Sequence, residues 1–265
     1  MNEKQTSVPT ATDWLFESLP TAERSVIRST YMVLSTKTSR KGTAFSLSTG
    51  PVVTCEHVIR GSAPGDLVLI ASTGQHLPVK EIVVDVDSDL AALEVLHQPR
   101  EGFTIQTTEP HVEQKVRTWG YPLEYNGPSP ILSVGYIAGF NAVQTTDGSP
   151  IVKHYVVNAA FNPGNSGGPL IAEFQDAIVG VVVSKHAPIS DWHLSALEAL
   201  KHQKSGAQHR ARDAEGNEFT FSEGQLVGDL LQYFREMTQV VIGEAIAADE
   251  LAKFLDARGL PWKGM

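Results

Sequence analysis

The chain contains a single cysteine, Cys55, so no disulfide can form within it. Disulfides are common in secreted proteins, whereas cytosolic proteins keep their thiols reduced. The sequence also opens on the polar residues Met1–Thr6, without the apolar core of a signal peptide. These two features predict a protein of the reducing cytoplasm. Because a lone thiol is most often buried and structural, we expect that role for Cys55 rather than that of a nucleophile.

Basic residues and long apolar runs are also scarce. The chain has 21 Lys and Arg against 30 Asp and Glu, a net charge of −9. Nucleic-acid binding requires clustered basic residues, so we expect no nucleic-acid partner. No apolar run approaches the roughly 20 residues of a membrane-spanning helix, so we expect no membrane partner. The spacing of the histidines at 186, 193, 202 and 209 matches no common zinc motif, and we expect neither a metal nor a cofactor.

One serine stands in an unusually glycine-rich turn. The segment Asn162–Leu170 places Ser166 among three glycines, with a proline on either side. Glycines permit backbone conformations that are closed to other residues and let a substrate backbone approach closely. A serine on such a turn can present its hydroxyl outward while nearby N–H groups point at one spot, as an oxyanion hole requires.

Two upstream segments end or begin apolar, strand-like runs with a residue that can take part in proton transfer. His57 follows the run from Val52, and Asp89 directly precedes Leu90 and Ala91. The chain order His, Asp, Ser is one of several on which unrelated folds have converged for serine hydrolysis, and it is the order of the chymotrypsin-like double barrel.

These segments carry a resemblance to a known family. Thr54–Val58, Asp89–Ala91 and Ala159–Leu170 resemble the histidine, aspartate and nucleophile segments of trypsin-like (chymotrypsin-fold) serine peptidases of the bacterial, disulfide-free, HtrA-like type. The resemblance covers roughly residues 26–186 and resumes near residue 238. It implies a mainly β fold with two six-stranded antiparallel barrels and the catalytic cleft between them. It also implies a serine endopeptidase that acts on proteins or peptides, here without room for a PDZ domain.

The resemblance assigns a role to each residue of the triad. Ser166 would attack the peptide carbonyl and form the acyl-enzyme, with His57 as general base and then general acid. Asp89 would orient the imidazole of His57. Asp85 and Asp87 are rival candidates for that carboxylate, and the family pattern favours Asp89 because it directly precedes Leu90-Ala91.

The resemblance also indicates how the substrate would be held. Backbone N–H groups of Gly164 and Ser166 would form the oxyanion hole. Ala160 occupies the position at the base of the primary specificity pocket, and with no carboxylate there we expect a small or apolar P1 side chain. The strand that would pair with the extended substrate contributes the binding residues Val182, Val183 and Ser184.

Short apolar runs between polar or glycine-bearing turns predict the strands of both barrels. Those of the first barrel are Ser29–Thr36, Thr43–Ser48, Pro51–Thr54, Asp66–Ala71, Val79–Val86 and Leu90–Leu96. Those of the second are Val112–Trp119, Ile131–Phe140, Ile151–Ala159, Pro169–Glu173, Ala177–Ser184 and Val240–Ala247.

The chain therefore divides into five predicted parts. They are an N-terminal polar and helical extension (1–25), the first barrel (26–100), the main part of the second barrel (101–186), a helical insertion (187–237), and the last barrel strand with a C-terminal helix (238–265). Within the insertion, Gln203–Glu218 has the polar, glycine-bearing composition of a mobile surface loop. We expect the insertion to gate the cleft or to receive a regulatory protein partner; the alternative is a passive decoration that packs elsewhere.

Two alternatives stay open beside a constitutive peptidase. The barrels and the insertion could form a binding or sensor module whose triad is catalytically silent. The chain could also be a partner-activated protease, as in a regulated defence effector. Covalent reaction of Ser166 with an active-site probe separates an assembled triad from either alternative.

Overall fold

The computed structural model describes residues 10–99, 101–123, 125–144, 148–173, 177–185, 191–212, 216–237 and 242–263. The chain forms two compact units. One, the barrel unit, comprises Met1–Lys185 and Val241–Met265. The other, the inserted unit, comprises His186–Val240. None of the described helices combines the length and the apolar character that crossing a membrane requires.

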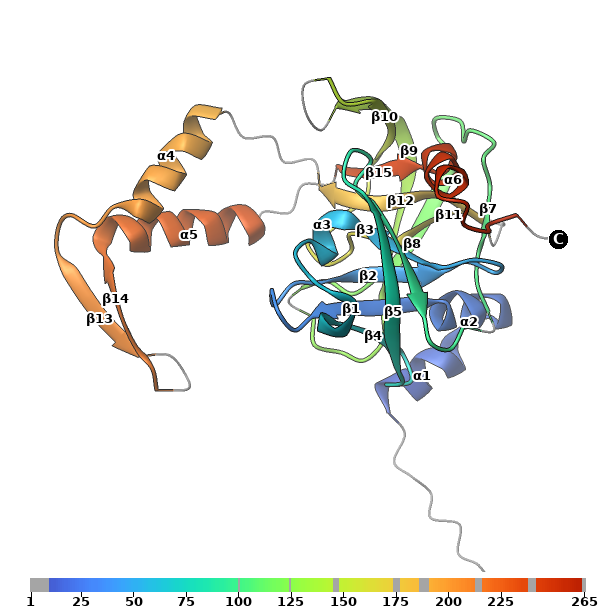
Figure 1. Cartoon of the computed structure of the whole chain (residues 1–265), viewed down its shortest axis with the longest axis horizontal. Helices are drawn as coiled ribbons and strands as arrows, with labels where there is room; N and C mark the ends of the chain where they lie inside the picture. Colours follow the sequence, from blue (N-terminus) through green and yellow to red (C-terminus); the bar gives the residue numbers. More distant parts are fainter. Residues whose placement is uncertain are drawn as a thin grey trace, which may run out of the picture. The chain divides into compact units, whose positions relative to one another are not determined.

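The first barrel is a closed ring of six antiparallel strands in the order β1-β2-β3-β6-β5-β4 (Figure 1). Val33 on β1 and Leu69 on β4 are Cα partners. Both side chains are fully buried, because alternate side chains along a strand point to the same face and these two point into the barrel. The strands are β1 (Thr30–Ser35), β2 (Lys41–Ser46), β3 (Val52–Cys55), β4 (Leu67–Ala71), β5 (His76–Asp85) and β6 (Leu90–Val95). A short helix, α3 (Glu56–Ile59), follows β3, and a single 3-10 turn, η1 (Pro64–Asp66), precedes β4.

The second barrel has the same number of strands, in the order β11-β8-β9-β10-β15-β12, and the pairing of β11 with β12 closes it. Its strands are β8 (Lys115–Gly120), β9 (Ile131–Gln144), β10 (Ile151–Val157), β11 (Pro169–Ala172), β12 (Ala177–Lys185) and β15 (Gly243–Ala247). A short strand, β7 (Thr104–Ile105), lies parallel to β12. The predicted class of two six-stranded antiparallel barrels is therefore confirmed.

The inserted unit connects two neighbouring strands of the second barrel. Lys185, at the end of β12, is the Cα partner of Gly243, at the start of β15. The points at which the inserted unit leaves and rejoins the barrel unit are thus adjacent in the sheet.

The strand predicted from Val112 starts later than its apolar residues suggested. Val112 lies in a turn, because the next residue, Glu113, has a positive φ of 75° that a strand does not allow, and β8 begins only at Lys115.

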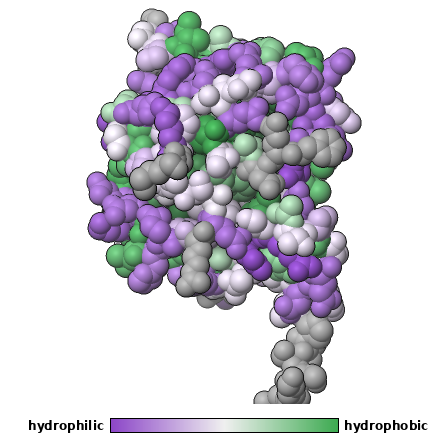
Figure 2. All heavy atoms as spheres, turned by 90° about the vertical axis from the view of Figure 1, so that its right-hand side faces the viewer, coloured by the Kyte–Doolittle hydropathy of each residue, from purple (hydrophilic) through white to green (hydrophobic). Residues whose placement is uncertain are grey.

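Three helices pack against the barrels. They are α1 (Ala11–Ser18), α2 (Thr21–Arg28) and α6 (Ala248–Ala257). Glu23 of α2 accepts a hydrogen bond from the indole of Trp119 and pairs with Arg117, which ties the N-terminal extension to the second barrel. Polar residues predominate on the face of the molecule that carries α6, and apolar residues show between them in small groups (Figure 2).

The inserted unit consists of α4 (Asp191–His202), a hairpin of β13 (Gln208–Arg212) and β14 (Glu218–Ser222), and α5 (Glu223–Met237). The interpretation of Gln203–Glu218 as a surface loop was therefore wrong for Gln208–Arg212, where β13 forms. The alternating residues Phe219 and Phe221 explain the pairing, because both rings lie on one face of the hairpin, 5.8 Å apart.

Helix α5 meets α4 through its small residues. A Cβ atom added to Gly228 would lie 3.2 Å from the Cβ of Leu200, so the two helices touch there. The large apolar side chains of α5 are elsewhere and range from 42% to 62% exposed; they are Leu226, Val227, Leu230, Leu231, Tyr233 and Phe234. The inserted unit thus leaves an apolar helix face uncovered, a pattern typical of a surface that binds another protein segment.

Candidate active site

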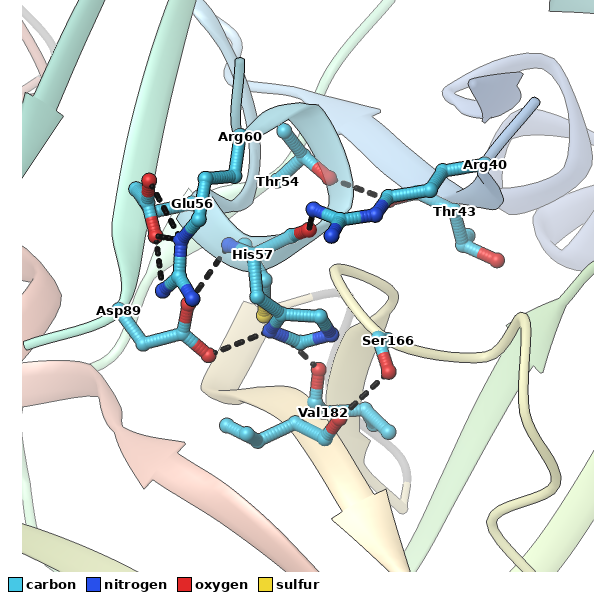
Figure 3. Close-up of polar contacts among 11 residues, drawn as sticks. Arg40, Thr43, Thr54, Glu56, His57, Arg60, Asp89, Ser166 and Val182 are labelled. Atoms are coloured by element: carbon cyan, nitrogen blue, oxygen red, sulfur yellow. Dashed lines mark hydrogen bonds and ion pairs between the residues drawn. The ribbon is translucent and has the colours of Figure 1, made fainter. Parts of the chain in front are cut away.

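Asp89 holds both the backbone and the ring of His57. His57 is the second residue of α3, directly after β3, and Asp89 closes the turn between β5 and β6 with a positive φ of 55°. One carboxylate oxygen accepts a hydrogen bond from the His57 N–H at 2.8 Å, and the other lies 2.7 Å from Nδ1 (Figure 3). The ring is therefore fixed with its second nitrogen, Nε2, turned away from the carboxylate.

The carboxylate of the rival candidate Asp85 is bound within the turn itself. Asp85 accepts hydrogen bonds from the Ser88 hydroxyl at 2.8 Å and from the Asp87 N–H at 3.2 Å. These contacts shape the turn that presents Asp89. Of the three aspartates of this segment, the structure brings Asp89 to His57.

Ser166 lies at the mouth of the same site but faces strand β12. Its Oγ donates a hydrogen bond to the carbonyl oxygen of Val183, 2.5 Å away, and among the described residues no hydrogen bond joins Ser166 to His57 (Figure 3). The next residue, Gly167, has a φ of 84° and donates its N–H to the carbonyl of Val182 at 2.7 Å. The nucleophile turn is thus anchored to β12 at the serine and directly after it.

Leu123 sets the orientation of the peptide before Gly164, a predicted oxyanion donor. The carbonyl oxygen of Pro163 accepts a hydrogen bond from the N–H of Leu123 at 2.7 Å. Because a trans peptide bond holds its C=O and N–H in opposite directions, the N–H of Gly164 points away from Leu123. The φ of 96° at Gly164 is a conformation that favours glycine.

The peptide before Ser166 is held in the same manner. The carbonyl oxygen of Asn165 accepts a hydrogen bond from the N–H of Gly168 at 2.9 Å, so the N–H of Ser166 points to the opposite side. A cavity of about 440 Å³ beside this turn is lined by Gly164 and Ser166 together with His57. The predicted oxyanion donors and two members of the predicted triad therefore border one space.

Thr43 contacts the nucleophile turn, a contact that the sequence did not predict. Its hydroxyl donates to the carbonyl of Gly164 at 2.7 Å and accepts from the N–H of Tyr121 at 3.0 Å. Its own N–H donates to the carbonyl of Ser166 at 2.9 Å. Thr43 is fully buried, and it comes from the first barrel while its partners come from the second. It therefore fixes the nucleophile turn across the interface of the barrels.

The predicted substrate-binding residues differ in the hydrogen bonds that their backbones make. Val182 is buried and exchanges backbone hydrogen bonds with the nucleophile turn: its N–H donates to Gly168 and its carbonyl accepts from Gly167. Its backbone is therefore engaged within the protein. The carbonyl of Val183 is the one that faces Ser166. The side chain of Ser184 lies outside the described residues.

Ala160 is half-buried, and the neighbouring Phe161 is 2% exposed. A Cβ atom added to Gly243 would lie 2.1 Å from the ring of Phe161, so the ring packs directly on the backbone of β15. Neither residue carries a charge near the base of the predicted specificity pocket.

Cys55 is fully buried, and its thiol donates to the carbonyl of Val182 at 3.4 Å. Burial, aided by the negative charge of Asp89, raises the pKa of this thiol well above its usual value. Its Sγ lies near the ligand atoms of His57 and Asp89, all within 4.8 Å of one another. Because metals and electrophiles react with the thiolate, a thiol that stays protonated is poorly suited to either role.

The two barrels and the paired His57 and Asp89 define a chymotrypsin-like architecture. A model of the trypsin-like peptidase domain matches residues 42–181, just over half of the chain, and the chain belongs to this family.

Two curated relatives are HtrA-like proteases. Protease Do-like 1, chloroplastic, of Arabidopsis thaliana is 31% identical over 52% of this chain and 31% of the relative. Serine protease Do-like HtrA of Lactobacillus helveticus is 29% identical over 72% of this chain and 46% of the relative. The chain thus spans less than half of the length of each.

A solved structure shows a similar fold. The active form of the Rv3671c protease from M. tuberculosis has a TM-score of 0.62 and 17% identity, and the match covers 92% of this chain and 87% of that one.

Proposed function

We propose that the chain is a serine endopeptidase that hydrolyses peptide bonds through an acyl-enzyme on Ser166. The observation that carries the proposal is the double hold of Asp89 on His57. One carboxylate oxygen binds the backbone N–H and the other lies 2.7 Å from Nδ1. A carboxylate in this position selects the tautomer with the proton on Nδ1 and leaves Nε2 free to accept the proton of a nucleophile.

The proposed reaction requires one movement of the serine. Oγ of Ser166 leaves the carbonyl of Val183, turns to His57 and gives its proton to Nε2 as it attacks the scissile carbonyl. Asp89 stabilises the resulting imidazolium, which then protonates the leaving amine. Water attacks the acyl-enzyme in the second half of the reaction, again with His57 as base.

The N–H groups of Gly164 and Ser166 would bind the oxyanion of each tetrahedral intermediate. Loss of one such donor costs roughly 3–4 kcal/mol of transition-state stabilisation in comparable enzymes. Both groups border the cavity that His57 also lines, and their carbonyl partners are held by Leu123 and Gly168.

The proposed substrate is an extended peptide with a small or apolar P1 side chain. Ala160 and Phe161 offer no charge that would bind a basic P1 residue. The carbonyl of Val183 would accept the N–H of the P1 residue, because Ser166 already approaches that oxygen in the structure. The peptide would thus add a strand beside β12.

We further propose that the inserted unit regulates access to the site through a protein partner. Its attachment points, Lys185 and Gly243, are Cα partners at the end of the substrate-binding strand. The uncovered apolar face of α5 supplies a surface for such a partner. A catalytically silent module remains the second candidate, favoured by the missing hydrogen bond between Ser166 and His57 among the described residues. The buried, unpaired Cys55 supports a cytoplasmic, reducing location.

Reaction with a fluorophosphonate probe tests the proposal, because the probe phosphonylates only an activated serine. We expect the wild-type chain to be labelled and Ser166→Ala and His57→Ala not to be. Hydrolysis of peptides should fall by several orders of magnitude in both variants, since the triad acts as a unit. Asp85→Asn serves as a control that retains labelling. A folded wild-type chain that is neither labelled nor able to cleave any peptide would favour the silent module.

A further inference from the structure

The cavity beside the triad extends toward the side on which the leaving group must depart. Val183 marks the side of the acyl part, because its carbonyl faces Ser166 from β12. His57 protonates the leaving amine, so the residues after the scissile bond lie on the far side of its ring from β12. The cavity of about 440 Å³ continues there, along Arg40, Val58 and Arg60.

Arg40 brings an exposed positive charge to this wall. It lies in the connection between β1 and β2, directly after Ser39, whose φ is 54°. Its guanidinium donates a hydrogen bond to the backbone carbonyl of His57 at 2.8 Å (Figure 3). This contact places the charge beside the catalytic histidine and uses one N–H, while a guanidinium has five.

The other two basic residues of the wall, Lys41 and Arg60, already have hydrogen-bond partners within the protein. Arg60 makes a two-pronged ion pair with Glu56, whose side chain is 7% exposed. The ammonium of Lys41 donates to the carbonyl oxygens of Pro122 and Tyr125. Among the described residues that line this cavity, no side chain is acidic. The wall therefore offers positive charge and several unused guanidinium N–H groups to whatever occupies it.

We propose that this peptidase prefers substrates with an acidic side chain among the first three residues after the scissile bond, and that Arg40 is the specificity-determining residue that binds it. The inference rests on the proposed function and adds a substrate class to it. Guanidinium groups bind carboxylates through paired N–H···O bonds, a geometry that a lysine ammonium does not reproduce.

Internally quenched peptides with alanine at P1 test the inference. Three series carry Asp, Asn or Lys at P1′, P2′ or P3′ and are otherwise identical. At one of these positions we expect the ratio of kcat/KM for Asp over Asn to be about three to five, the upper part of what an exposed ion pair supplies. The peptide with Lys at that position should be cleaved more slowly than the peptide with Asn. High salt should reduce both differences.

Variants of Arg40 separate specificity from positioning of His57. Arg40→Gln should bring the Asp/Asn ratio close to one, and Arg40→Lys should restore part of it. A loss of His57 positioning would lower kcat for all peptides alike and leave the ratio unchanged. Lys253→Gln, an exposed basic residue of α6, is the matched control and should keep the wild-type ratio. Anisotropy titrations of the same peptides into Ser166→Ala give the preference independently of turnover.

The outcomes distinguish the two proposals. Equal kcat/KM and equal affinity for Asp and Asn peptides at all three positions would overturn the acidic preference, while fluorophosphonate labelling still upheld the peptidase. A ratio that persists in Arg40→Gln would overturn the role of Arg40. Absence of labelling together with absence of hydrolysis would overturn the peptidase itself.

Discussion

The hydroxyl of Ser166 donates its hydrogen bond to the carbonyl oxygen of Val183, with 2.5 Å between the two oxygens. An extended substrate on β12 would bring the N–H of its P1 residue to that same carbonyl. The substrate N–H and the serine hydroxyl therefore compete for one acceptor. We infer that a bound peptide displaces the hydroxyl and directs it toward His57. Occupation of the cleft would in this way complete the triad.

Asp89→Asn should lower kcat/KM for peptide hydrolysis by about 10⁴ while the fold is kept. The amide loses the charge that stabilises the imidazolium, and it can donate to Nδ1 and so select the wrong tautomer. Asparagine tolerates the positive φ of this position, so little strain is added. The measurement is peptide hydrolysis together with circular dichroism.

Asp85→Asn is the matched control for that experiment. Its carboxylate binds Ser88 and the backbone of Asp87, so the change should alter stability slightly and leave the rate within a few-fold of wild type. Equal losses in the two variants would contradict the assignment of Asp89.

Thr43→Val should reduce kcat by about tenfold to a hundredfold. The substitution removes the donor to the Gly164 carbonyl and leaves that buried oxygen unpaired, a penalty of about 1–3 kcal/mol. The Gly164 peptide would then lose the orientation that directs the neighbouring N–H groups. Thr43→Ser keeps the hydroxyl and should restore most of the rate. Comparable activity of the valine and serine variants would show that the hydroxyl does not position the turn.

The candidate triad could be predicted because each member stands in a local pattern with a physical meaning. Ser166 lies in a glycine-rich turn, and His57 and Asp89 lie at the ends of strand-like runs. The contact of Ser166 with Val183 depends on a side-chain rotamer, which no local pattern specifies. Thr43 binds Gly164 across 121 positions of sequence, so its role appears only when the barrels meet.

The fold was predictable to a similar extent. Strands in which alternate side chains are buried could be predicted from the sequence, because the alternation of apolar and polar residues is a local pattern. The pairing of β13 with β14 was missed, since the charged residues of Gln208–Arg212 resemble a surface loop and the partner strand, Glu218–Ser222, comes later in the sequence. The first residues of β8 were assigned too early because the positive φ of Glu113 leaves no mark in the sequence.

Cys55 should resist alkylation by iodoacetamide in the folded protein and react readily in urea. Its folded pKa is raised by burial, whereas the unfolded thiol has a pKa of about 8.5. As pH rises above that value, the unfolded state loses a proton that the folded state keeps, so the free energy of unfolding falls. Relative to Cys55→Ala, wild type should lose about 1.4 kcal/mol per pH unit above the unfolded pKa. Urea titrations at pH 7.5 and pH 9.5 measure this difference. A pH-independent difference, or fast alkylation without urea, would contradict the protonated buried thiol.

Removal of the inserted unit should leave the barrel unit folded. Lys185 and Gly243 are Cα partners on neighbouring antiparallel strands, so an Asn-Gly turn can join them in place of residues 186–242. The melting temperature should stay within a few degrees, and the fluorophosphonate probe should still label Ser166. If the inserted unit regulates access, hydrolysis of an unfolded protein such as reduced casein should change by at least about tenfold, a coupling of about 1.4 kcal/mol.

A short chromogenic peptide should respond far less to the same deletion, because it occupies only the cleft. The double substitution Leu230→Ser and Leu231→Ser keeps the unit and removes part of the apolar face of α5, whose side chains there are 46% and 50% exposed. If that face binds a regulatory partner, this variant should lose the partner's effect while its basal hydrolysis of the short peptide stays at the wild-type level. If the deletion changes hydrolysis of the protein and of the peptide by the same factor, the inserted unit does not control access to the cleft.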